Sequence, residues 1–315
     1  MQTLIGHTDV TNFFDAVVAH DRLSHAYGFV GPEHVGKETY VKQLAAKLLL
    51  TTPETLLVHP DFFLVDRLRD EKTNKRSQHI DVDQIRDLTS VLRRSAVRGG
   101  YTIAVVTDAG HMNSYAANAL LKTLEEPKSR AILFLLTEDK DQVPATIQSR
   151  CQWVYFSPVK ETALAQALQN RGVEAGVANT LAHVSRGLPG QALGWVTDTE
   201  SYSEYEREIE QFWTMLGKPL YEKMAITEHI SSNKDEHRET KDELWKTFSL
   251  WELLIRDILC TTVAPLAGKS LSSRVPHWSR RQWLGATQAI RDARAQIGSN
   301  VQPRLLVEHI LLALP

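Results

Sequence analysis

The chain has 315 residues, of which 43% are hydrophobic and 23% charged, a composition typical of a globular protein with two or three domains. Its net charge is -2 and its pI about 6.6, so it lacks the basic excess of a protein that grips nucleic acid alone. No apolar run approaches the roughly 20 residues that span a bilayer, and the first residues do not resemble a secretion signal. We therefore expect a cytoplasmic protein whose DNA contacts, where it has any, are local or shared with partners.

Short apolar runs alternate with amphipathic segments in the first half of the chain, which predicts an α/β fold with a parallel sheet covered by helices. The run 102–107 is apolar except at its ends, which favours a strand buried on both faces. Residues 67–78 are polar and predict an exposed loop. Strands are expected at 25–30, 61–65, 102–107, 131–137 and 153–156, and helices at 37–50, from Asp81 onward and at 114–126.

From Pro158 onward the pattern predicts helices only, over 161–170, 177–186 and then longer segments beyond Ser201. The segment Gly187-Leu188-Pro189-Gly190 separates them. A near-heptad stripe beyond Ser201 is either an internal core or a seam to another subunit, and both interpretations stay open. This stripe comprises Leu244, Phe248, Trp251, Ile255 and Ile258. The change of pattern predicts three domains, at 1–158, 159–200 and 201–315.

The segment Gly31-Pro32-Glu33-His34-Val35-Gly36-Lys37 matches a phosphate-binding loop up to its lysine. It follows an expected strand and opens an expected helix, so its backbone N–H groups and the lysine would face phosphate. The next residue should be Ser or Thr, whose hydroxyl holds magnesium, but here it is Glu38. A metal ligand is therefore missing from the loop.

A second element of such a site is also altered. Asp108 ends the strand expected at 102–107, where P-loop hydrolases carry an aspartate, but Ala109 stands where a hydrolase would carry glutamate. We therefore expect a degenerate nucleotide site, possessing Gly31, Gly36, Lys37 and Asp108. Binding of ATP or ADP stays open, hydrolysis is not expected, and no cofactor is required.

Other segments resemble the motifs of bacterial clamp-loader subunits. The helix Ala116–Pro127 resembles the signature helix of that family, and Ser149-Arg150-Cys151 is similar to its SRC motif. Similar too are the segments 24–27, 80–86 and 300–306. The resemblance is dense over residues 5 to 157, thinner to 195 and sparse in the last third.

This resemblance implies an AAA+ fold, with a RecA-like ATPase domain, a small helical lid and a helical collar that assembles a ring. It implies gamma- or tau-type motor subunits and a delta-type subunit as partners, together with the sliding clamp and, through the assembled complex, primer-template DNA. No membrane is involved. It also implies that Arg150 is an arginine finger that serves a neighbouring subunit in trans, whereas the alternative is an internal salt bridge.

Within that family, Glu38, Ala109 and Gly190 depart from the motor pattern, because Gly190 stands where a motor would carry a sensor arginine. These departures favour the non-hydrolysing delta-prime class, a stator in loading the clamp during DNA replication. Many members carry a four-cysteine zinc module, but residues 51–58 contain no cysteine, so no metal is expected. The alternatives are a gamma- or tau-type ATPase motor with unusual motifs and an unrelated P-loop transferase.

Overall fold

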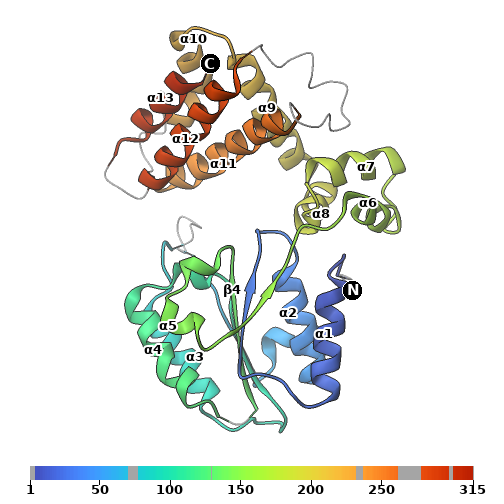
Figure 1. Ribbon diagram of the computed structural model, residues 1–315. Coiled ribbons are helices and arrows are strands. Elements are labelled where there is room, and N and C mark those ends of the chain that lie inside the picture. Colours follow the sequence, from blue (N-terminus) through green and yellow to red (C-terminus); the bar gives the residue numbers. More distant parts are fainter. Residues whose placement is uncertain are drawn as a thin grey trace. The chain divides into compact units, whose positions relative to one another are not determined.

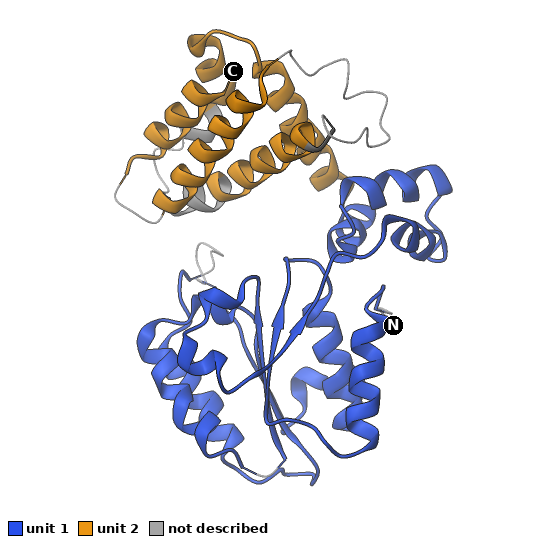
Figure 2. Cartoon of the chain, in the orientation of Figure 1, with its two compact units in different colours: residues 1–198 blue, residues 199–315 orange. Residues whose placement is uncertain are grey.

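The structure is a computed structural model that describes residues 4–69, 77–128, 130–231, 237–261, 278–297 and 301–314. The chain divides into two compact units, residues 1–198 and 199–315 (Figure 2). Most of the polar segment predicted as an exposed loop at 67–78 lies outside the described residues. The predicted division into three domains stays a prediction.

A five-stranded parallel sheet forms the centre of the first unit, in the order β2-β3-β4-β1-β5 (Figure 1). Every residue of β1, β3 and β4 is buried, because helices cover both faces of the sheet, as the apolar run of β3 predicted. The predicted α/β class is thereby confirmed. The strands are β1 (Ala26–Val30), β2 (Phe62–Val65), β3 (Thr102–Val106), β4 (Ala131–Thr137) and β5 (Gln152–Tyr155).

Two helical layers enclose this sheet (Figure 1). Alternate residues of β3 serve the two layers: Ile103 and Val105 pack with α1 and α2, whereas Ala104 and Val106 pack with α3, α4 and α5. The helices of the first layer are α1 (Thr8–Ala19) and α2 (Lys37–Leu48), and those of the second are α3 (Val82–Leu92), α4 (Ser114–Glu125) and α5 (Ala145–Gln148). Short 3-10 turns are η1 (Leu56–Val58), η2 (Ala109–His111) and η3 (Lys140–Gln142).

The first residues of two helices show when the start of a helix can be predicted from the sequence. Helix α3 begins directly after Asp81, where the sequence predicted a helix, and Asp81 and Gln84 form a reciprocal capping box. Helix α1 has no such signal: its N-cap is His7, in a left-handed conformation and with no side-chain cap, so the sequence pattern did not reveal it.

Three helices complete the first unit: α6 (Glu161–Gln169), α7 (Ala175–Val184) and α8 (Pro189–Thr197). The segment 187–190 was predicted as punctuation between helices, but Pro189 occupies the first turn of α8, where its missing N–H costs nothing. Gly187 adopts a φ of 75° and accepts a hydrogen bond from the N–H of Val159 at 2.8 Å. A Cβ at this position would collide with the Val159 carbonyl, so the turn requires glycine.

The second unit is helical throughout its described residues, with α9 (Thr199–Met215), α10 (Leu220–Ser231), α11 (His237–Thr261), α12 (Arg280–Gln296) and α13 (Pro303–Ala313). The stripe on α11 that the sequence left between two interpretations lies in the core of this unit, where it packs with Trp283 of α12 and Ile310 of α13. None of the helices in the described parts of the chain is long and apolar enough to cross a membrane.

Candidate functional site

The predicted phosphate-binding loop connects β1 to α2, and each of its two glycines has a structural reason. A Cβ at Gly31 would lie 2.3 Å from the carbonyl oxygen of Phe156. Gly36 is the N-cap of α2 and has a φ of 112°, a conformation that side chains with a Cβ rarely adopt. The sequence therefore placed the loop correctly between a strand and a helix.

Lys37 lies at the start of α2 and is only 9% exposed. Its ammonium donates to two carbonyl oxygens of its own loop, those of Gly31 and Pro32, the latter at 2.8 Å. Burial lowers the pKa of Lys37, while the negative charges of carboxylates including Glu138 and Asp108 act to raise it. The structure thus brings Lys37 and Asp108 into one electrostatic neighbourhood, with the lysine turned onto its own backbone.

Glu38, which replaces the expected hydroxyl residue, is an exposed side chain in the first turn of α2. Its carboxylate accepts a hydrogen bond from Lys42 one helical turn later, at 2.6 Å. Glu38 therefore adds negative charge beside the phosphate loop, where a nucleotide would bring its own negative charge.

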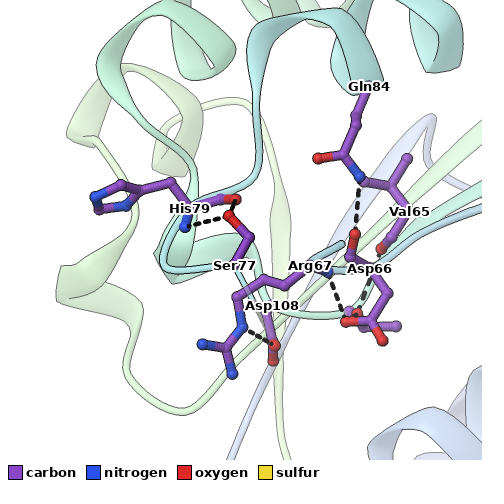
Figure 3. Close-up of polar contacts among 8 residues, drawn as sticks. Val65, Asp66, Arg67, Ser77, His79, Gln84 and Asp108 are labelled. Atoms are coloured by element: carbon purple, nitrogen blue, oxygen red, sulfur yellow. Dashed lines mark hydrogen bonds and ion pairs between the residues drawn. The ribbon is translucent and has the colours of Figure 1, made fainter. Parts of the chain in front are cut away.

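Asp108 follows β3 and is paired with Arg67, which follows β2 (Figure 3). The Nε of Arg67 donates to Oδ2 of Asp108 at 2.7 Å, and the two side chains are only 16% and 22% exposed. Arg67 was predicted to belong to an exposed loop, and for this residue the prediction is wrong, because its guanidinium turns back onto the end of the sheet.

The backbone beside Arg67 is fixed by Asp66 (Figure 3). Oδ1 of Asp66 accepts hydrogen bonds from the N–H of Arg67 and from the hydroxyl of Thr107, both at 2.8 Å. The side-chain amide of Gln84 donates to the carbonyl oxygen of Asp66, also at 2.8 Å. Strand β2, strand β3 and the capped start of α3 therefore hold this corner together.

Helix α8 meets the phosphate loop at Gly190. Its N–H donates to the carbonyl oxygen of His34 at 2.8 Å, and a Cβ at position 190 would lie 3.0–3.2 Å from atoms of His34. A larger residue here would require this contact to open. In the same loop, the carbonyl oxygen of Val35 accepts a hydrogen bond from Nε2 of His7 at 2.9 Å.

Arg150 lies at the other end of the sheet from the phosphate loop. Strand β5 runs parallel to β1, with Tyr27 opposite Gln152 and Val30 opposite Tyr155. Arg150 comes before β5, at the amino ends of the strands, whereas Gly31 comes after β1, at the carboxyl ends. The two are separated by a four-residue strand, which spans about 13 Å, so Arg150 is not part of the chain's own phosphate site.

The guanidinium of Arg150 has contacts within the chain. It donates to Glu125 Oε1 at 2.7 Å and to the carbonyl oxygen of Thr146 at 2.7 Å, and its side chain remains 34% exposed. The internal salt bridge that the sequence left as an alternative is therefore present. Burial raises the pKa of the neighbouring Cys151 thiol to about 12, so Cys151 is not a reactive thiolate at neutral pH.

Sequence reasoning selected Gly31, Gly36, Lys37 and Asp108 as one site and Arg150 as a separate one. In the structure the loop follows β1 and Asp108 follows β3, both at the carboxyl ends of parallel strands, whereas Arg150 precedes β5. That these residues form a nucleotide site stays a prediction. Sequence reasoning missed Arg67. The available signal was an arginine two residues after the end of an apolar strand, at the edge of the sheet where Asp108 was expected. Within the described residues, no three side chains among His, Cys, Asp and Glu are grouped to hold a metal ion.

Comparison with known proteins gives a consistent set of relatives. A family profile described as "DNA polymerase III, delta subunit" matches residues 6–160, about half of the chain. The DNA polymerase III subunit delta' of Pseudomonas aeruginosa is 36% identical over 142 residues, which cover 41% of this chain and 42% of that protein. The match therefore spans less than half of the length of that relative.

Two further matches extend over almost the whole chain. Subunit delta' of DNA polymerase III from Bacillus subtilis is 25% identical over 324 residues, covering 94% of this chain and 92% of that protein. A crystal structure of a DNA polymerase III gamma subunit-related protein from Thermotoga maritima superposes with a TM-score of 0.47 at 19% identity, covering 95% of this chain and 97% of that one.

Proposed function

Because the chain belongs to the clamp-loader family of bacterial DNA polymerase III subunits, we propose that it acts as a stator subunit of the delta-prime type. In this role it assembles with gamma- or tau-type motor subunits and a delta-type subunit, and the complex loads the sliding clamp onto primed DNA during replication. Primer-template DNA is contacted through the assembled complex, consistent with the net charge of -2. The place of action is the cytoplasm.

The position of Arg150 carries this proposal. The arginine lies at the amino ends of the strands, away from its own phosphate loop, and its side chain is 34% exposed. A planar guanidinium in such a place suits the spread negative charge of a phosphoryl group held by a neighbouring subunit. We therefore assign Arg150 as an arginine finger that acts in trans.

The chain's own loop has lost the groups that hydrolysis needs. Glu38 replaces the magnesium-binding hydroxyl residue, and Ala109 replaces the glutamate that activates water. No cofactor is required, and ATP or ADP held by Gly31, Gly36, Lys37 and Asp108 would not be turned over. An ATPase assay on the isolated chain separates this function from that of a gamma- or tau-type motor: a magnesium-dependent rate abolished by Lys37→Ala would identify a motor.

The trans role is tested by Arg150→Ala in a reconstituted loader. We expect the variant to fold and assemble, and the clamp-dependent ATPase rate to fall. Arginine fingers contribute about 10³ to 10⁵ in rate at a single site. The rate of the whole loader falls by less, because the other motor sites keep their own fingers. Arg150→Lys restores little, since an ammonium does not reproduce the planar fork.

Glu125→Gln is the decisive comparison, because it removes the internal ion pair and leaves the guanidinium in place. If Arg150 serves only that ion pair, both variants lower the ATPase rate equally. Under the trans role, Arg150→Ala has much the larger effect. Arg86→Ala, which removes an exposed arginine paired with Asp83, is the matched control. Gel filtration verifies assembly, and wild-type ATPase in assembled Arg150→Ala complexes would rule out the trans role.

A further inference from the structure

We infer that Arg67 takes the place of a divalent cation at Asp108, so that this phosphate loop does not hold a magnesium nucleotide. The proposed stator function requires only that the chain does not hydrolyse ATP. The inference about Arg67 is a different one, that its guanidinium prevents a metal ion from binding. The two proposals therefore stand or fall separately.

The register of the sheet places Arg67 beside Asp108. Strand β2 pairs with β3 so that Val65 lies opposite Val106. Arg67 and Asp108 each follow two residues later, at the carboxyl ends of adjacent parallel strands, where P-loop proteins bind the metal of their nucleotide. The Nε of Arg67 is 2.7 Å from Oδ2 of Asp108, as Figure 3 shows.

The charges at this corner oppose a metal ion. A divalent cation that used Asp108 would lie beside the positive guanidinium of Arg67. Both side chains are largely buried, at 16% and 22% exposure, so water screens this repulsion less than it would at the surface. The guanidinium of Arg67 therefore already supplies the positive charge that a cation at Asp108 would bring.

The arrangement is anchored on the backbone side as well. The carboxylate of Asp66 accepts hydrogen bonds from the N–H of Arg67 and from the hydroxyl of Thr107. The side-chain amide of Gln84 donates to the carbonyl oxygen of Asp66 (Figure 3). Arg67 therefore starts from a fixed backbone position, unlike a long side chain on a mobile surface loop, and loses less conformational entropy when it pairs.

Each group that would meet a magnesium nucleotide has an internal partner. Lys37, which would bind phosphate, donates to carbonyl oxygens of the loop. Asp108, the carboxylate that would bind the metal ion, accepts a hydrogen bond from Arg67. Glu38, which replaces the metal-binding hydroxyl residue, accepts a hydrogen bond from Lys42. The residues present do not fit a magnesium ion. Comparison of the loop sequence with those of hydrolysing proteins reveals the change at Glu38 but not the part played by Arg67.

The test is binding of manganese–ADP to the full chain, measured by isothermal titration and by the electron spin resonance signal of free manganese. Glu38→Thr restores a hydroxyl to the loop. We expect wild type and Glu38→Thr to bind manganese–ADP weakly or not at all. The double variant Glu38→Thr with Arg67→Ala should bind at least tenfold more tightly than Glu38→Thr alone. Titration of ADP in EDTA separates metal binding from nucleotide binding.

Charge and folding have their own controls. Arg67→Lys in the Glu38→Thr background keeps a cation at Asp108 and should keep metal binding weak. Arg86→Ala in the same background removes an exposed arginine and should change nothing. Circular dichroism checks folding, and Arg67→Gln serves if the alanine variant does not fold.

Two results would overturn the inference. One is tight manganese–ADP binding by the wild-type chain. The other is equal affinity of Glu38→Thr and the double variant, including the case in which neither binds. Neither result bears on Arg150, whose role is measured in the assembled loader.

Discussion

One buried carboxylate fixes the backbone of a connecting segment in the first unit. Asp61, just before β2, is only 2% exposed and accepts hydrogen bonds from the N–H groups of Val97 and Arg98 at 2.6 and 3.0 Å. Its own carbonyl oxygen accepts from the N–H of Ile103, at the start of β3. One aspartate thus fixes the connection from α3 to β3 against the edge strand.

We predict that Asp61→Ala lowers the free energy of unfolding by about 1–3 kcal/mol, because the N–H groups of Val97 and Arg98 lose their acceptor. Thermal unfolding and amide hydrogen exchange measure the effect, and exchange should accelerate at those two amides. The control is Asp83→Ala, which removes an exposed carboxylate and should leave stability nearly unchanged. Equal effects of the two variants would mean that the Asp61 contacts contribute nothing.

At this scale the sequence predicted single residues when a motif fixed their spacing. Gly31, Gly36 and Lys37 belong to one contiguous motif, and Asp108 ends an unmistakably apolar strand. Arg67 could not be predicted as its partner, because their contact depends on which strand lies beside β3 and in which register. Such pairing is a property of the folded sheet and leaves no spacing in the sequence.

At the scale of elements, an ion-pair network joins α11 to α12. Glu252 accepts from Arg291 at 2.8 Å and from Arg294 at 2.6 Å, and the Arg294 guanidinium lies 4.0 Å from the centre of the Trp245 ring. Burial alone would raise the pKa of Glu252, but the hydrogen bonds and charges of the two arginines together lower it. The network therefore stabilises the ionised carboxylate in the folded unit.

We predict that the stabilisation by Glu252 depends on pH. Because its pKa is lower in the folded state, its contribution is fully present above the unfolded pKa of about 4.5 and is lost as the pH falls through the folded value. Urea unfolding of wild type and Glu252→Gln should show a constant difference from pH 7 to about 5 and a shrinking one below. Glu308→Gln, on an exposed pair with Arg304, should show a smaller difference. A difference that does not change with pH would contradict the role of the charge.

Elements were predicted well where burial dictates the residue pattern. The runs at β3 and β4 are apolar along their length because both faces of the sheet are covered. Helices α1 and α8 were not predicted, because the residues at their starts do not indicate a helix. Helix α1 has a histidine as its N-cap, and α8 begins in a segment rich in glycine and proline. Short helices depend on tertiary packing more than on such local signals.

At the scale of the whole molecule, the chain consists of two units, and we predict that each folds without the other. The first unit includes α6 to α8, and within it the N–H of Gly190 donates to the carbonyl oxygen of His34 in the phosphate loop. Fragments 1–198 and 199–315, expressed separately, should each unfold cooperatively in circular dichroism. A second cut at residue 158, where we also predict a domain boundary, should leave a folded sheet fragment. Loss of cooperative unfolding in any fragment would reject the boundary that produced it.

The resemblance at this scale came from motifs far apart in the sequence. The segments around Lys122 and Arg150 were informative because the family carries both, and the ion pair of Glu125 with Arg150 shows that they also meet in space. The arrangement of neighbouring subunits depends on the partners' surfaces as well as on those of this chain. The sequence therefore predicted the class of assembly and not its geometry.

The separation of Arg150 from the phosphate loop also bears on how many active sites an assembly containing this chain can have. The sheet has the arginine at one end and the loop at the other, so the two sites lie on different sides of the first unit, as a head-to-tail contact between subunits requires. Under the proposed role, a ring made only of copies of this chain would place every arginine beside a loop that does not hydrolyse ATP, and no site would be active. Placed among motor subunits, the chain would complete the active site of one neighbour and add no active site of its own. A ring that contains it would then have fewer active sites than subunits.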